Sequence, residues 1–168
     1  MPKAYSPDRI WTVYLSGEIH TDWRERIVAG AAAAELPVEF SSPVTHHESS
    51  DDCGVAILGA EADKFWHDNK GARLNAIRTR TLIQEADLVV VRFGDKYRQW
   101  NAAFDAGYAA ALEKPYVVLH DAALNHALKE VDGAALAVAS EPEQIVELLR
   151  YVIRGDLAGY GDARAAAE

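Results

Sequence analysis

Residues 85–115 read E-A-D-L-V-V-V-R-F-G-D-K-Y-R-Q-W-N-A-A-F-D-A-G-Y-A-A-A-L-E-K-P. The run L-V-V-V at 88–91 is apolar, rich in β-branched residues and free of polar alternation. Such a run is typical of a strand that is buried on both faces of a parallel sheet. Gly94 and Asp95 then supply turn chemistry, and the alanine-rich segment 99–112 predicts a helix. The stretch is therefore interpreted as a strand–turn–helix unit.

Two polar residues stand near the start of this predicted helix. Asn101 and Asp105 are four residues apart, so their side chains share one helix face. They lie just beyond the carboxyl end of the predicted strand, which is where ligands bind in open α/β sheets. This placement predicts a binding site.

Strand and helix patterns alternate along the rest of the chain. We expect strands at 10–15, 38–40, 88–91, 116–120 and 134–138, and helices at 22–36, 63–67, 72–85, 99–112, 124–131 and 142–153. Residues 41–59 predict a long irregular loop, and Gly71 is expected to break the helical pattern around it. The alternation predicts an α/β fold with a parallel sheet, helices on both faces and right-handed crossovers. We expect a flavodoxin-like, doubly wound, five-stranded sheet in the order 2-1-3-4-5.

Length and charge limit the classes of function. A chain of 168 residues with a net charge of −9 is interpreted as a single domain, residues 1–168, with a substantial core. The negative charge argues against nucleic-acid polymers as partners but not against a small nucleoside or nucleotide. From residue 154 onward the sequence is rich in glycine and poor in apolar residues, which predicts a flexible or oligomer-contacting tail.

Cysteine usage and hydropathy indicate a compartment. The single cysteine, Cys53, excludes an intrachain disulfide and suits a reducing environment. The sequence shows no signal-peptide pattern and no apolar stretch near the roughly 20 residues that span a bilayer. We therefore expect a cytoplasmic protein with no membrane partner.

Neither a metal nor a redox cofactor is expected. Six potential metal ligands occur close together in the sequence, but their spacing fits no zinc signature: His46, His47, Asp51, Asp52, Cys53 and His67. No G-x-G-x-x-G motif follows any predicted strand.

The expected strand order brings two segments to one crevice between the first and third strands. One segment carries Tyr14, Ser16, Gly17 and Glu18, and the other carries Phe93, Gly94, Trp100, Asn101 and Asp105. A carboxylate beside a tyrosine in a partly dry cleft can act as a nucleophile or stabilise a cationic transition state. Cleavage of an N-glycosidic bond develops such a positive charge on the sugar.

These motifs resemble the nucleoside 2-deoxyribosyltransferase superfamily. The family's opening strand, Y-x-A/S-G-P, is matched by Y-L-S-G-E at 14–18, and its A-D before an apolar strand is matched at 86–90. Its signature G-T-x-x-E-x-G-x-A-x-A-x-x-K-P is matched by N-A-A-F-D-A-G-Y-A-A-A-L-E-K-P at 101–115. The resemblance covers most of residues 10–119. It is closest to the YtoQ-type branch, through S-G-E-I-H-T-D-W-R at 16–24 and R-T-R-T-L-I at 78–83.

The resemblance implies a reaction and a set of roles. The family's carboxylate attacks the anomeric carbon of a 2-deoxynucleoside and expels the base, and a second base or water then takes the sugar. By position, Asp105 is the nucleophile, Tyr14 orients it, and Glu18 and Asp87 border the pocket. The resemblance also implies a homo-oligomer.

Three departures from the family pattern change the expected chemistry. The nucleophile position holds Asp105 in place of glutamate, and Asn101-Ala102 replaces Gly-Thr. Arginines at 78 and 80 flank the position where the family has a base-reading acid. Paired arginines suggest an anionic ligand such as phosphate, although only one of two residues at this spacing is expected to face the site.

These observations predict an enzyme that hydrolyses or transfers the N-glycosidic bond of a nucleoside or nucleotide. Asn101 is expected to contact the sugar, Trp100 or Phe93 to stack on the base, and Arg78 or Arg80 to meet a phosphate. The departures favour one alternative, a non-catalytic nucleotide-binding or sensing module that keeps the family's fold and pocket but not its chemistry. Taken alone, Asp105 is also compatible with a helix-face carboxylate paired with an arginine. A structural subunit is a further alternative, because the alanine-rich segments 31–34 and 109–111 allow close helix packing.

Overall fold

Five parallel strands form one sheet in the order β2-β1-β3-β4-β5, which confirms the predicted strand order. The computed structural model describes residues 9–157. The strands are β1 (Trp11–Gly17), β2 (Val38–Ser41), β3 (Leu88–Arg92), β4 (Tyr116–Leu119) and β5 (Ala137–Ala139). Strand β1 lies between β2 and β3 and is parallel to both. Strand β2 is added on one side of β1 and β3 on the other, so the strand order reverses between β1 and β3.

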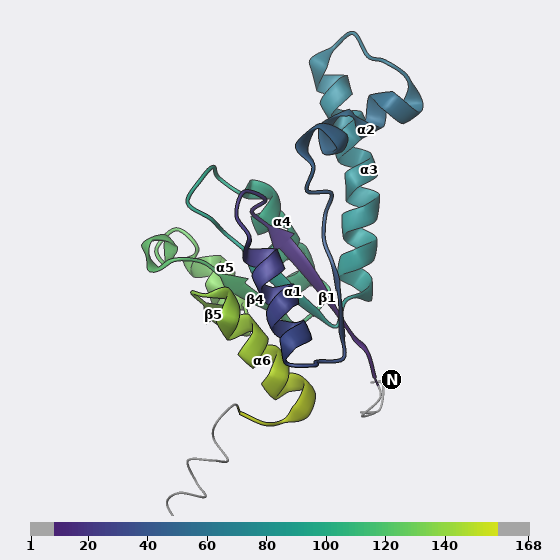
Figure 1. Cartoon of the computed structure of the whole chain (residues 1–168). Coiled ribbons are helices and arrows are strands. Elements are labelled where there is room, and N and C mark those ends of the chain that lie inside the picture. The colour runs from purple at the N-terminus through teal and green to yellow at the C-terminus, as the bar shows by residue number, and fades with distance from the viewer. Residues whose placement is uncertain (1–8, 158–168) are drawn as a thin grey trace, which may run out of the picture.

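Helices cover both faces of the sheet (Figure 1). Helices α1 (Trp23–Ala33) and α6 (Pro142–Arg154) share one apolar cluster with the sheet. Helices α3 (Lys64–Glu85), α4 (Trp100–Ala111) and α5 (Lys129–Ala134) contribute to a second cluster. A short 3-10 turn, η1 (Ala122–Leu124), precedes α5, so the single helix predicted at 124–131 is replaced by two shorter pieces.

The strand predicted at 88–91 divides its side chains between the two clusters. Val89 and Val91 pack toward α3 and α4, whereas Leu88 and Val90 pack toward α1 and α6. All four are buried. The apolar run is therefore needed because successive side chains of a strand point to opposite faces and here both faces are covered.

The prediction of an irregular loop at 41–59 is wrong, because helix α2 (His47–Leu58) occupies most of this segment. The ring of His46 starts this helix by accepting a hydrogen bond of 3.2 Å from the backbone N–H of Ser49. Histidine is an unusual capping residue, so the sequence carried no ordinary start signal. In Figure 1, α2 and the beginning of α3 project together beyond the sheet.

Gly71 does not break a helix, since α3 runs continuously through it. A Cβ at Gly71 would lie 2.8 Å from the carbonyl oxygen of Asp51, and one at Gly54 would lie 2.4 Å from the backbone nitrogen of Gly71. The two glycines therefore allow the backbones of α2 and α3 to approach closely.

The predicted tail begins inside the last helix. Arg154 is the final residue of α6, and Gly155 ends that helix with φ of 74°. The rest of the predicted tail, 158–168, lies outside the described residues. Across residues 9–157, none of the helices combines the length and apolar character that spanning a membrane requires.

Candidate active site

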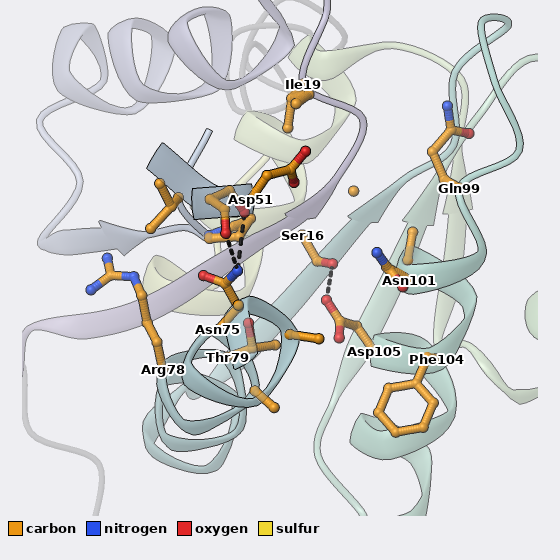
Figure 2. Close-up of a pocket in the computed structure, with 18 of the residues that line it drawn as sticks. Ser16, Ile19, Asp51, Asn75, Arg78, Thr79, Gln99, Asn101, Phe104 and Asp105 are labelled. Atoms are coloured by element: carbon orange, nitrogen blue, oxygen red, sulfur yellow. Dashed lines mark hydrogen bonds between the residues drawn. The ribbon is translucent and has the colours of Figure 1, made fainter. Parts of the chain in front are cut away.

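A cavity of about 650 Å³ lies at the carboxyl edge of the sheet. Its wall is formed by the end of β1, the face of α3, the start of α4 and the beginning of α2 (Figure 2). Seven of the predicted site residues line it: Ser16, Gly17, Glu18, Arg78, Arg80, Asn101 and Asp105. The site therefore lies where the strand order reverses, as open α/β sheets require of their ligand sites.

Ser16 and Asp105 meet inside the cavity. The Ser16 hydroxyl donates a hydrogen bond of 2.6 Å to Oδ2 of Asp105 (Figure 2). Burial raises the pKa of Asp105, and the hydrogen bond from Ser16 acts in the opposite direction. Among the described residues, the other carboxylate oxygen, Oδ1, has no hydrogen-bond partner. The carboxylate is thus held by one oxygen and free at the other.

Tyr14 lies beneath the cavity wall, fully buried in the cluster shared with α3 and α4. Its hydroxyl donates to Oγ1 of Thr79 at 3.5 Å. Burial raises the pKa of Tyr14 to about 12, so the phenol is neutral at pH 7. The hydrogen bond to Asp105 comes from Ser16 and not from Tyr14. The predicted role of Tyr14 as the orienter of Asp105 therefore stays a prediction.

The turn after β1 has a backbone shape that only glycine suits. Gly17 has φ of 109°, and a Cβ there would lie 2.0 Å from the carbonyl oxygen of Arg92. The next residue, Glu18, is buried. Its carboxylate accepts hydrogen bonds from the backbone N–H of His20 and, at 2.7 Å, from the hydroxyl of Thr21. Glu18 therefore holds the turn as well as lining the cavity.

The buried side chain of Arg24 stabilises the same turn through hydrogen bonds to its backbone. Its guanidinium donates to the carbonyl oxygens of Leu15 at 3.1 Å, Gly17 at 3.0 Å and Glu18 at 2.6 Å. Burial lowers the pKa of Arg24 to about 10, so the side chain remains cationic at pH 7. Arg24 is not among the predicted site residues, because an arginine in the first turn of a helix is ordinarily exposed.

Asn101, Arg78 and Arg80 all line the cavity. The carboxamide of Asn101 has no hydrogen-bond partner within residues 9–157 and lies beside the Ser16–Asp105 pair in Figure 2. Arg78 donates to the carbonyl oxygen of Ser42 at 3.2 Å. The guanidinium of Arg80 lies 5.9 Å from the centre of the Tyr108 ring. Both arginines thus contribute to the cavity wall, and the expectation that only one of them faces the ligand stays a prediction.

Besides Tyr14, four predicted site residues do not line the cavity: Asp87, Phe93, Gly94 and Trp100. Asp87 precedes β3, at the opposite edge of the sheet, where it pairs with Arg9 and accepts a hydrogen bond of 3.0 Å from the backbone N–H of Thr12. Phe93 is 4 % exposed and packs in the core, whereas Trp100 is 73 % exposed outside the cavity wall. The predicted binding roles of these three residues are therefore not retained.

Gly94 supports the site without lining it. A Cβ at Gly94 would lie 2.6 Å from Cγ of Glu18. The absence of a side chain at Gly94 therefore lets Glu18 take its place in the turn.

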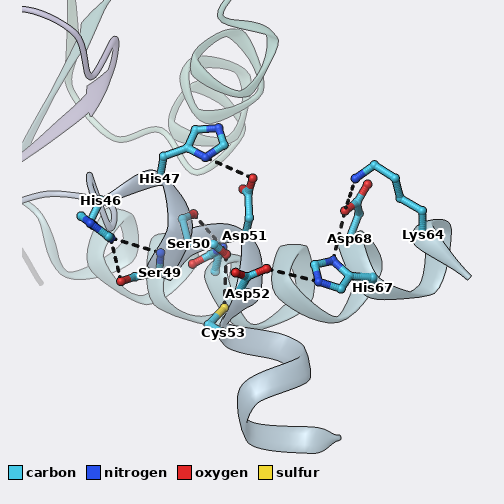
Figure 3. A network of polar contacts seen from close by, with 11 residues as sticks. His46, His47, Ser49, Ser50, Asp51, Asp52, Cys53, Lys64, His67 and Asp68 are labelled. Carbon is cyan, nitrogen blue, oxygen red and sulfur yellow. Dashed lines mark hydrogen bonds and ion pairs between the residues drawn. The ribbon is translucent and has the colours of Figure 1, made fainter. Parts of the chain in front are cut away.

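The histidines and acids of α2 and α3 form local pairs (Figure 3). His47 pairs with Asp51 at 3.3 Å, and His67 pairs across the two helices with Asp52 at 3.2 Å. The thiol of Cys53 donates to the carbonyl oxygen of Ser50. In the part of the chain that the structure describes, no three histidine, cysteine or acidic side chains are grouped so as to hold a metal ion.

Several residues of the cavity wall are absent from the sequence prediction. Asn75 donates to the carbonyl oxygen of Ser50 at 2.9 Å and so connects α3 to α2. His20 and Tyr97 come from the two loops that follow β1 and β3. Loop residues carry no periodic pattern, so only their position after a strand could have indicated them.

The family described as nucleoside 2-deoxyribosyltransferase YtoQ matches residues 14–153. The chain belongs to this family. A YtoQ relative from Bacillus subtilis (strain 168), the uncharacterized protein YtoQ, is 39 % identical over 140 residues, which are 83 % of this chain and 95 % of that protein.

Two solved structures resemble this YtoQ-family chain. A conserved protein from Enterococcus faecalis V583 has a TM-score of 0.58 at 15 % identity, over 86 % of this chain and 99 % of its own. A 2-deoxyribosyltransferase from Bacillus psychrosaccharolyticus has a TM-score of 0.49 at 16 % identity, over 80 % of this chain and 90 % of its own. The likeness to the Enterococcus faecalis protein shows a shared fold.

Proposed function

We propose that this protein cleaves or transfers the N-glycosidic bond of a (deoxy)nucleoside or nucleotide, with Asp105 as the nucleophile. One observation carries the proposal: a half-buried carboxylate is held through one oxygen by Ser16 and presents the other to the cavity. Membership of the YtoQ family supports the same chemistry. A carboxylate in a partly dry site stabilises positive charge on a sugar more strongly than one in water.

The reaction has two displacements. Oδ1 of Asp105 attacks the anomeric carbon of the sugar, the C–N bond breaks, and the base leaves with the bonding electrons and takes up a proton. The sugar is then held as an ester of Asp105. A second base completes a transfer by attacking the same carbon, whereas water completes a hydrolysis and gives up a proton. Either attack restores the carboxylate.

Asn101 is proposed to contact the sugar. Its unpaired carboxamide stands one helical turn before Asp105 and on the same face of α4. An amide supplies both donor and acceptor groups to hydroxyls. The sugar thus lies at the inner end of the cavity, against the nucleophile.

Arg80 is proposed to contact a phosphate when the substrate is a nucleotide. Arg78 and Arg80 line the cavity from different sides of α3, one toward Ser42 and the other toward Tyr108. Tyr108 stands one turn after Asp105, so Arg80 is on the side of the nucleophile. Neither arginine forms an ion pair with a carboxylate among the described residues.

A homo-oligomer, which the family resemblance implies, remains part of the proposal. Analytical ultracentrifugation of the purified protein tests it, and sedimentation as a single monomeric species would contradict it.

The proposal is tested by incubating the purified protein with deoxynucleosides, ribonucleosides, their 5′-monophosphates and NAD, and following free base by chromatography. Asp105→Asn is assayed in parallel, with the exposed Asp95→Asn as a matched carboxylate control. We expect base release by the wild type and Asp95→Asn, and none by Asp105→Asn. Binding without base release would instead identify a nucleotide-binding module, and neither binding nor release would contradict both readings.

A further inference from the structure

Tyr97 has a backbone conformation that its position in the chain does not explain. Three non-glycine residues in the described part of the chain have positive φ: Glu35 at 51°, Tyr97 at 62° and Glu113 at 55°. Glu35 and Glu113 stand directly after the caps of α1 and α4, where a left-handed residue commonly ends a helix. Tyr97 lies in the loop between β3 and α4 and ends no helix. Such a conformation costs free energy and occurs preferentially at functional sites.

The loop around Tyr97 is held in this shape by Gln99. The backbone N–H of Gly94 donates to the side-chain oxygen of Gln99 at 3.2 Å, and the side-chain nitrogen of Gln99 donates to the carbonyl oxygen of Lys96. Both ends of the Gln99 carboxamide are therefore used within the loop, in hydrogen bonds to Gly94 and Lys96, which precede Tyr97.

The ring of Tyr97 lies at the rim of the cavity. It lines the cavity and is 76 % exposed. Its centre lies 4.9 Å from the centre of the His20 ring, with the two planes inclined by 45°. His20 belongs to the loop after β1. The two loops that flank the site thus bring two aromatic rings together while leaving much of the Tyr97 ring uncovered.

The proposed reaction indicates which end of the substrate this rim receives. The sugar must reach Asp105, which is half-buried inside the cavity. The base must leave after the C–N bond breaks, and in a transfer another base must enter. The base therefore belongs at the open side of the cavity, where its planar face can stack on an exposed aromatic ring.

We propose that Tyr97 stacks on the nucleobase of the substrate and that His20 positions its ring. This inference rests on the proposed function, because it assigns the base end of a nucleoside. It transfers to Tyr97 the role that the sequence analysis gave to Trp100 or Phe93. Tyr97 then determines how tightly the base is held without taking part in the displacement at the sugar.

The test measures binding by calorimetry in the full-length Asp105→Asn protein, which keeps the ligand intact. The probes are 2′-deoxyadenosine, adenine and 2-deoxyribose 5-phosphate. Adding Tyr97→Ala is expected to weaken the first two about tenfold and to leave the sugar phosphate unchanged. Tyr97→Phe keeps the ring and is expected to retain affinity. Trp100→Ala removes an exposed ring outside the cavity and serves as the control.

The inference alone would be overturned by unchanged affinity for 2′-deoxyadenosine in Tyr97→Ala, or by an equal loss of affinity for the sugar phosphate. A larger loss in Trp100→Ala than in Tyr97→Ala would also overturn it and restore Trp100 as the stacking residue. If the parent protein binds neither these probes nor any nucleoside or nucleotide of the base-release panel, the proposed function fails and the inference fails with it.

Discussion

Ser16 at the end of β1 donates a hydrogen bond of 2.6 Å to Asp105 on α4, although 89 residues separate them in the sequence. The contact joins the two segments that meet where the strand order reverses. It leaves one carboxylate oxygen for chemistry, and it opposes the rise in the pKa of Asp105 that burial causes. Ser16 is therefore placed to control both the orientation and the ionisation of the proposed nucleophile.

Ser16→Ala is expected to move the acidic limb of the pH profile of kcat/KM to higher pH. Asp105 attacks only when ionised, and the hydrogen bond from Ser16 favours the ionised form. Its loss raises the pKa of Asp105 further, so activity disappears at a higher pH as the solution is acidified. Tyr14→Phe is the control, because the Tyr14 hydroxyl donates to Thr79. An equal displacement in both variants would assign the orienting role to Tyr14 instead.

Asp105→Asn is expected to raise the melting temperature at pH 7. Burial raises the pKa of Asp105 in the folded protein, so folding favours the protonated carboxyl, and stability falls as the pH rises from the unfolded pKa through the folded one. The side chain of asparagine is neutral at every pH, so the Asp105→Asn protein does not lose stability in this way as the pH rises. The advantage should shrink as the pH falls to about 4, near the ordinary pKa of aspartate. Thermal unfolding of the variant and the wild type at pH 7 and at about pH 4 measures this difference in melting temperature. A difference of the same size at both pH values would contradict a raised pKa of Asp105 in the folded protein.

Gly54→Ala is expected to destabilise the protein by about 1–3 kcal/mol through overpacking. Its Cβ would lie 2.4 Å from backbone atoms of α3, which cannot move aside as a flexible side chain would. Gly107→Ala is the matched control within α4, where a Cβ meets nothing within 4 Å. This control should gain up to about 1 kcal/mol from helix propensity. Urea unfolding measures both, and no destabilisation in Gly54→Ala would show that α2 and α3 do not pack through these glycines.

Arg80→Gln is expected to remove most of any preference for a 5′-monophosphate over its nucleoside. A charge-assisted hydrogen bond contributes about 1.5–3 kcal/mol, which corresponds to about tenfold or more in affinity. Arg78→Gln should change the preference less, because Arg78 extends toward Ser42 and away from α4. Paired affinities for thymidine and thymidine 5′-monophosphate provide the measurement. A larger effect of Arg78→Gln would contradict the placement of the phosphate.

The sequence predicted the sheet and the meeting of its two functional segments because both depend on local patterns. The L-V-V-V run at 88–91 indicated a strand buried on both faces, and β3 is that strand. Once the strand order was expected, the residues after β1 and at the start of α4 had to converge. Ser16 and Asp105 accordingly lie in contact.

The errors concern side-chain direction and unusual local contacts. Phe93 continues the alternation of Val89 and Val91 and so turns into the same apolar cluster, which a stricter use of the strand period would have indicated. Asp87 precedes β3 and therefore lies at the opposite edge from the cavity, although the family pattern placed it at the pocket.

Two further features had no readable signal. Helix α2 begins at a histidine cap and packs through glycines, which sequence patterns ordinarily assign to loops. Tyr97 reaches the cavity through a loop conformation that no periodicity describes.

The central claim, that Asp105 attacks the sugar, is tested most directly by mass spectrometry of the protein quenched in acid during turnover. The substrate is whichever nucleoside or nucleotide shows base release. We predict that the peptide containing Asp105 gains the mass of one glycosyl group, and that the same peptide from Asp105→Asn gains none. Steady release of base by a protein that carries no such adduct at Asp105, or an adduct on another residue, would contradict the account.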